Sequence, residues 1–245
     1  MPLFDPNAFA ILSAGIFAGA VVSGLVGFAF SAVAGVFLLQ VLPPTEAVPL
    51  MMACSLVTQG VSLYALRGSV QWRGNPVLIV AGIFGVPPAL YLLHHVDAGI
   101  FRVGFGLFLV AYAAVMLLRP KATPATQSAS RLRDAIVGFG GGLIGGLTAM
   151  PGALPTIWCA LRGLPKDQQR GIVQPYITVM QVFALAVMLM HNSFSARTLV
   201  SLTYSLPALA IGAGVGVLMF HRVNDVMFRS AVLSVLMFAG VFLVL

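Results

Sequence analysis

An apolar run without a single charge, from Ala8 to Val41, limits most strongly what this chain can fold into. As one continuous helix the run would be about 51 Å long, whereas the hydrocarbon core of a bilayer is only about 30 Å thick. The middle of the run, "SGLVGFAFS", contains Ser23, Gly24 and Gly27, and glycine readily adopts the backbone conformations of turns. The run therefore has to tilt steeply or to break inside the membrane.

The composition places the rest of the chain in the membrane as well. Of the 245 residues, 60 % are hydrophobic and only 8 % are charged, which is too little polar surface to cover a water-soluble core of this size. Apolar stretches long enough to span a bilayer as helices recur along the chain. They lie at 47–66, 75–93, 100–118, 172–190, 198–220 and 228–245, with a second glycine-rich segment at 136–161. The predicted fold class is therefore an all-α integral membrane protein.

The chain also resembles itself when it is shifted along its own length. A shift of 122 residues aligns "SGL" at 23–25 with "GGL" at 145–147, "LP" at 42–43 with "LP" at 164–165, and Gln59 with Gln181. A shift of 127 matches "HHVDAGIFR" at 94–102 with "HRVNDVMFR" at 221–229, and loops tolerate such a change of offset. Two repeats are predicted, 1–118 and 135–245, joined by an exposed polar linker rich in Pro, Ser and Thr at 119–134.

The distribution of Lys and Arg distinguishes two ways in which the first segment of each half can lie. If that segment crosses once, the 13 cations divide six against seven between the two faces, which violates the usual cytoplasmic excess. If it enters and leaves by the same face, eleven cations share one face and only Arg102 and Arg197 lie on the other. We therefore predict in each half a re-entrant helical hairpin, with turns at 23–27 and 147–155, followed by three transmembrane helices. The two repeats then have inverted topology, the linker is cytoplasmic and both termini are periplasmic.

The two turns are expected to face a substrate pathway, because broken helices at membrane depth must be buried in protein or line a watery cavity. The second arm of each hairpin starts at its turn, near 28–31 and 152–156. A helix start carries roughly half a positive charge, so two of them would hold a small anion without a buried Lys or Arg. The residues predicted to bind this anion are Ser23, Gly24, Gly27, Phe28, Ser31, Gln59, Thr148, Met150, Gly152, Thr156 and Gln181.

A purely structural interpretation of the same polar side chains stays open. Ser and Thr often bond carbonyls of their own helix, and Gln joins transmembrane helices to each other. The run "GFGGGLIGG" at 138–146 contains a GxGxxG match, but no strand precedes it, so close helix packing is favoured over phosphate binding. All six Asp and Glu residues lie near predicted span ends. No buried carboxylate, catalytic residue, metal ligand or cofactor site is therefore predicted.

Two glycine-rich segments open the two halves, "AGAVVSGLVGFAFS" and "GFGGGLIGGLTAMPGALP", and a Leu-Pro pair leads from each into the next span. In these features, and over nearly its whole length, the chain resembles the TauE/SafE sulfite exporters, also called the anion permease family. The resemblance implies a membrane protein of the bacterial inner membrane that moves a small sulfur-containing anion such as sulfite or an organosulfonate.

The expected function is thus a secondary transporter that works by alternating access of the two halves, and a passive anion channel of the same architecture is the alternative. The expected partners are the anionic substrate and membrane lipids, and the chain is expected to be a monomer or a homodimer. Nucleic acid is not expected, because the basic residues are spread over short loops between spans. An enzyme is not expected either, because no His, Asp or Glu lies at mid-span to activate a nucleophile.

Overall fold

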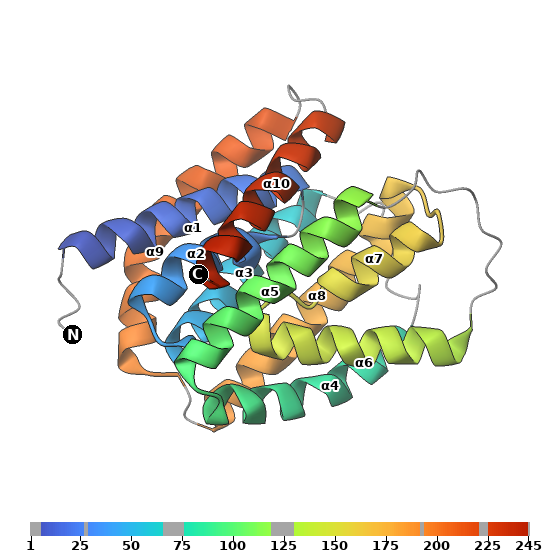
Figure 1. Cartoon of the computed structure of the whole chain (residues 1–245), viewed down its shortest axis with the longest axis horizontal. Coiled ribbons are helices and arrows are strands. Elements are labelled where there is room, and N and C mark those ends of the chain that lie inside the picture. The colour runs from blue at the N-terminus through green and yellow to red at the C-terminus, as the bar shows by residue number, and fades with distance from the viewer. Residues whose placement is uncertain are drawn as a thin grey trace.

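The computed structural model describes residues 6–26, 29–65, 76–118, 130–191, 194–220 and 225–244 of the chain. Within these ranges the chain forms ten α-helices and no strand, which confirms the predicted all-α class (Figure 1). The helices are α1 (Pro6–Val26), α2 (Phe30–Val41), α3 (Pro44–Ala65), α4 (Pro76–His95), α5 (Ala98–Leu118), α6 (Arg131–Thr148), α7 (Ala153–Leu161), α8 (Lys166–Met190), α9 (Ala196–Phe220) and α10 (Asp225–Val244).

Five of the described helices contain stretches long and apolar enough to cross a membrane. These stretches are Pro6–Gly24, Pro76–His95, Ala98–Leu118, Gly171–Met190 and Arg197–Gly216. Four of them match predicted spans, and α3 and α10 occupy the positions of the two remaining ones. Large apolar side chains such as Phe84 and Met190 lie on the outside of the bundle, where lipid rather than water suits them. The chain is therefore a multi-pass helical membrane protein.

The first apolar run breaks into two helices, α1 and α2, that pack against each other in opposite directions. Gly15 of α1 lies against Phe37 near the end of α2, whereas Gly19 lies against Phe30 at the start of α2. A Cβ added to Gly15 would lie 2.5 Å from the Cβ of Phe37, and one added to Gly19 would lie 2.9 Å from the carbonyl oxygen of Phe30. Glycine permits this close approach of two helices, and the predicted helical hairpin is present.

The hairpin turns later in the chain than the sequence predicted. Ser23 and Gly24 belong to α1, which continues to Val26, so the prediction that they form the turn is wrong. Gly24 serves packing instead, because a Cβ added to Gly216 of α9 would lie 3.0 Å from the Cα of Gly24. This tertiary contact overrides the roughly 1 kcal/mol by which glycine disfavours a helix interior.

An alanine in the left-handed conformation marks each of the two helix breaks. Ala29 directly precedes α2 with a φ of 81°, and Ala149 directly follows α6 with a φ of 57°. This conformation costs an L-residue roughly 1–2 kcal/mol, so it persists only where the surrounding structure enforces it. Gly27, predicted in the first turn, and Phe28, predicted at the start of the second arm, lie outside the described residues.

The second glycine-rich segment forms the hairpin of α6 and α7. Helix α6 ends at Thr148 and α7 begins at Ala153, so the break lies within 147–155, as predicted. At the opposite end of the hairpin, Nε1 of Trp158 in α7 donates a hydrogen bond of 2.8 Å to Oδ1 of Asp134 near the start of α6. The two helices therefore run in opposite directions.

Helix α6 begins earlier than the sequence predicted, and its first turn contains a buried carboxylate that was not predicted. The helix begins at Arg131, so the last residues of the segment predicted as linker, 119–134, are helical, while 119–129 lie outside the described residues. Asp134 is only 5 % exposed, although no buried carboxylate was predicted. The first turn of a helix favours a negative charge, and the Trp158 indole supplies a hydrogen bond to the carboxylate.

The glycine run at 138–146 packs α6 on two sides. Gly138 and Gly142 lie very close to the backbone of α4. A Cβ added to Gly138 would overlap the backbone of Leu78, and one added to Gly142 would overlap the backbone of Gly82. Gly145 faces the turn of its own hairpin, where an added Cβ would lie 2.5 Å from the Cβ of Pro151. The predicted role of this run in close helix packing is confirmed.

Helices of the two halves pair in a reciprocal pattern. Helix α1 packs on α9, and its counterpart α6 packs on α4. In the same way α3 packs on α9, and its counterpart α8 packs on α4. The equivalent helices α5 and α10 pack on each other (Figure 1). The backbone of Phe17 contacts Gly212 of α9, and the backbone of Phe139 contacts Gly85 of α4. Phe139 lies 122 residues after Phe17, and Gly212 lies 127 residues after Gly85. The two offsets found in the sequence thus relate equivalent contacts.

Candidate functional site

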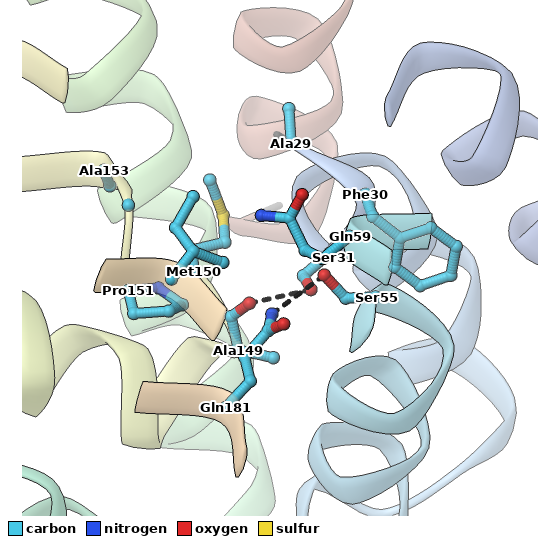
Figure 2. Close-up of a pocket in the computed structure, with 12 residues that line it drawn as sticks. Ala29, Phe30, Ser31, Ser55, Gln59, Ala149, Met150, Pro151, Ala153 and Gln181 are labelled. Atoms are coloured by element: carbon cyan, nitrogen blue, oxygen red, sulfur yellow. Dashed lines mark hydrogen bonds between the residues drawn. The ribbon is translucent and has the colours of Figure 1, made fainter. Parts of the chain in front are cut away.

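A small cavity lies inside the bundle where the two helix breaks meet (Figure 2). The start of α2, the turn before α7, and one face each of α3 and α8 form its walls. Its volume is about 20 Å³, which is room for about one water molecule. The lining residues are Ala29, Phe30, Ser31, Ser55, Gln59, Ala149, Met150, Pro151, Gly152, Ala153, Ile177 and Gln181.

The starts of two helices contribute the positive electrostatic character of the cavity. Phe30 and Ala153, the first residues of α2 and α7, both line it. The first amides of a helix have no carbonyl partner within that helix, and together they carry roughly half a positive charge. None of the described lining residues is charged. The cavity can therefore attract an anion through backbone dipoles alone.

Two glutamines from equivalent positions of α3 and α8 face this cavity. Gln59 and Gln181 are each 1 % exposed, and the Oε1 atom of each is buried without a hydrogen-bond partner in the part of the chain that the structure describes. A buried polar atom that lacks a partner usually costs about 1–3 kcal/mol. Such atoms at a cavity are explained most directly by a ligand or a water molecule that bonds to them.

The two glutamines are not held alike. Nε2 of Gln181 donates a hydrogen bond of 2.8 Å to Oγ of Ser55 (Figure 2). Ser55 lies one helical turn before Gln59, and the residue that corresponds to Ser55 in the second half is Ile177. Because isoleucine has no hydrogen-bonding side chain, Gln59 has no equivalent support. The amide of Gln181 is thus fixed by the opposite half, whereas that of Gln59 is available to a ligand.

A hydrogen bond also joins the two breaks directly. Oγ of Ser31, in the first turn of α2, donates to the carbonyl oxygen of Ala149 at the end of α6, over 2.9 Å (Figure 2). Ser31 is 2 % exposed, so water would have to enter the cavity to donate a hydrogen bond to the Ala149 carbonyl in its place. The bond holds the two breaks together in this conformation.

Replacing Ser31 by alanine is expected to lower the stability of the protein by about 1–3 kcal/mol, because the buried carbonyl of Ala149 loses its side-chain donor. For a chain of this size, each kcal/mol corresponds to about 2–4 °C in the thermal midpoint. The matched control is Ser205→Ala, since the hydroxyl of buried Ser205 donates to the Ser201 carbonyl of its own helix. Equal midpoints for the two variants in a detergent melting assay would remove any special role for the Ser31 bond.

The structure brings about half of the predicted site residues to the cavity. Ser31, Gln59, Met150, Gly152 and Gln181 line it. Gly27 and Phe28 lie outside the described residues.

Four other predicted site residues do not line the cavity. Ser23 and Gly24 lie within α1, where Ser23 is hydrogen-bonded to Thr58 over 3.3 Å. Thr148 donates to the carbonyl of Ile144 in its own helix, as the structural interpretation allowed. Thr156 is buried in α7, and its Oγ1 has no partner, but it is not a lining residue. These four lie away from the cavity because the breaks occupy fewer residues than the small-residue segments around them, and their role in anion binding stays a prediction.

Sequence reasoning did not name several lining residues, although Ala29, Phe30, Ala149, Pro151 and Ala153 lie in the ranges predicted to face the pathway. Ser55 and Ile177 each lie four residues before one of the glutamines, so helical periodicity around Gln59 and Gln181 would have found them. Ala29 and Ala149 had no such signal, because alanine shows no preference for the left-handed backbone that both adopt.

A second, larger cavity lies at the opposite end of the α6–α7 hairpin from its turn. Its volume is about 600 Å³, and it is lined by Arg131, Asp134, Trp158, Cys159 and Arg162 together with parts of α4 and α8. The guanidinium carbon of Arg162 lies 5.9 Å from the centre of the Trp158 ring, within the range of a cation–π contact. Arg131 begins α6 and Arg162 directly follows α7, so the first and last residues of the hairpin lie together at its open end.

The chain matches one protein-family model, that of the sulfite exporter TauE/SafE, over residues 11–243. No curated protein matches the chain significantly, and no solved structure does.

Proposed function

Because the chain belongs to the sulfite exporter TauE/SafE family, we propose that it is a secondary transporter that moves a small sulfur-containing anion across the membrane by alternating access. The observation that carries this proposal is the meeting of two helix starts and two glutamines at one cavity between the two halves. Broken helices that meet near the middle of the membrane are the usual substrate site of secondary transporters built from repeats.

The directions of the helices support an inverted relation between the two halves. Gly106 of α5 packs against Leu243 near the end of α10, whereas Val110, later in α5, packs against Gly240, earlier in α10. These equivalent helices therefore run in opposite directions. Repeats of the same orientation would place α5 and α10 parallel, so the packing favours an axis that lies in the plane of the membrane.

Contacts between helix ends support the proposed orientation in the bacterial inner membrane, with both termini periplasmic. Glu46, which follows the first hairpin, lies 3.9 Å from Arg197 at the start of α9, and both belong to the face with few cations. Arg131 and Arg162 line one cavity and belong to the face rich in cations. By the positive-inside tendency, the second face is cytoplasmic. The cavity with Arg131 and Arg162 would then be a cytoplasmic vestibule that raises the local concentration of anions.

The small size of the central cavity favours a carrier, whose binding site opens and closes, over a channel with a continuously open pore. A sulfur oxyanion is several times larger than the one water molecule for which there is room. The breaks therefore have to separate for the anion to enter, and the bond from Ser31 to Ala149 is one contact that separation would open. Alternating access consists of such a separation, first toward one face and then toward the other.

A ligand screen on the purified protein tests the proposal. Sulfite, thiosulfate, sulfoacetate and taurine are compared with phosphate by thermal denaturation, since a ligand at 100 times its dissociation constant adds about 2.7 kcal/mol of stability. A sulfur-containing anion is expected to raise the midpoint most. Liposomes then separate the two transport modes: counterflow that saturates with substrate indicates a carrier, and unsaturated conductance indicates an anion channel. No shift with any of these anions would contradict the proposed site.

A further inference from the structure

We propose that the central cavity takes its anion in the singly charged form, with one oxygen protonated where the anion is an oxyacid, and excludes the doubly charged form. This inference rests on the proposed function, because it concerns the charge state of the anion bound at that same site. Three features of the described residues carry it: the absence of cations at the cavity, the number of helix starts that face it, and the partnerless oxygens of its two glutamines.

No ionisable side chain lines the cavity in the part of the chain that the structure describes. The four helices that form its walls, α2, α3, α7 and α8, carry Glu46, Cys54, Cys159 and Tyr176 as their described titratable groups, and none of these is a lining residue. Glu46 lies at the start of α3 beside Arg197 of α9.

The titratable side chains of the surrounding helices do not line the cavity either. The described ones are Tyr91, His94 and His95 of α4, Arg102 and Tyr112 of α5, Arg131, Arg133 and Asp134 of α6, and Arg197 and Tyr204 of α9. Of these, Arg131 and Asp134 line the second cavity. The described residues therefore offer the anion only backbone and neutral side-chain groups.

The helix starts compensate one negative charge. Each start carries roughly half a positive charge, so α2 and α7 together supply about one. The cost of transferring an ion from water into a medium of low polarity grows with the square of its charge, and an uncompensated buried charge is strongly disfavoured. A second negative charge would enter this cavity without a counter-charge.

The glutamine oxygens favour the protonated form for a separate reason. Oε1 of Gln59 and Oε1 of Gln181 are buried acceptors without a donor. A fully ionised oxyanion has only acceptor atoms, whereas a hydrogen-bearing oxygen of a monoanion donates one hydrogen bond. Both oxygens can accept this bond, because the bond from Gln181 to Ser55 uses Nε2 and leaves Oε1 without a donor among the described residues.

Three anions on the intact purified protein test the inference. Sulfite changes from the singly to the doubly charged form around neutral pH, methanesulfonate stays singly charged, and sulfate, of similar shape and size, stays doubly charged. Each dissociation constant is measured by calorimetry at a series of pH values from about one unit below to two units above that ionisation. The expected result is that sulfite binding weakens about tenfold per pH unit on the alkaline side, because only the minor protonated form binds. Methanesulfonate binding should not change with pH, and sulfate should not bind.

The outcomes that overturn the inference differ from those that overturn the proposed function. Sulfite affinity that is constant or increases with pH, or sulfate that binds as tightly as methanesulfonate, would refute selection of the single charge while leaving an anion site in place. A parallel loss of sulfite and methanesulfonate binding would assign the titration to the protein, and it too would refute the inference. Absence of binding by all three anions would refute the site itself, and the inference with it.

Discussion

Gly142→Ala is expected to cause a large loss of stability. The Cβ of alanine would overlap the backbone of Gly82 in α4, and two packed backbones cannot yield as a flexible side chain does. Overpacking of this kind typically costs about 1–3 kcal/mol and occasionally more. Gly138 and Gly145 anchor the same helix on both sides, so a shift of α6 at Gly142 also displaces the turn that lines the central cavity. The measurements are the folded yield and the thermal midpoint in detergent.

The matched control for this variant is Gly214→Ala in α9. An alanine Cβ at Gly214 meets no atom within 4 Å, and alanine favours a helix over glycine by up to about 1 kcal/mol. The midpoint of this control should therefore stay constant or rise slightly. If Gly142→Ala behaved like Gly214→Ala, the close contact between α4 and α6 would not exist in the membrane-embedded protein.

Gln59→Leu is expected to weaken anion binding about 10- to 100-fold while the protein remains folded. A hydrogen bond to a charged ligand is worth about 1.5–3 kcal/mol, and each 1.4 kcal/mol is a factor of ten in the dissociation constant. Folding should be little affected, because Oε1 of Gln59 bonds no other group among the described residues and leucine has a similar size. The anion-induced rise of the thermal midpoint and the uptake of substrate by liposomes should therefore fall together.

Two further glutamines show whether this effect is specific. Gln40 donates to the Val36 carbonyl of its own helix and does not line the cavity, so Gln40→Leu should bind anion normally. Gln181→Leu removes the bond to Ser55 as well, and it should lose both stability and affinity. If Gln59→Leu lowered only the thermal midpoint and left anion affinity intact, Gln59 would be a structural contact between helices.

Much of the architecture could be predicted from the sequence because the membrane restricts the choices. A chain of this hydrophobicity must form helices of bilayer length, so the helices α4, α5, α8 and α9 lie close to where the apolar runs predicted them. The offset of 122 residues relates Gln59 to Gln181 through the sequence alone, and both reach the same cavity.

The local details of the site could not be predicted in the same way. Ser23 and Gly24 are residue types common in turns, but they form part of α1, where α9 packs against Gly24. Alanine is common in helices, but Ala29 and Ala149 lie at the two breaks. Asp134 was predicted near a span end without burial, yet Trp158 covers it and donates a hydrogen bond to it. In each case a residue distant in the sequence decides the local conformation.

The sequence by itself determined that this chain is a multi-pass helical membrane protein with two similar halves, because hydrophobic length and recurrent spacing are properties of the chain alone. Only the tertiary structure decided where each apolar run breaks and that Gln181 is held by Ser55 while Gln59 lacks an equivalent partner. The physical reason is that the contact between two halves depends on the close approach of glycine-bearing helices, such as α4 and α6. That approach brings together residues more than a hundred positions apart, such as Ser31 and Ala149.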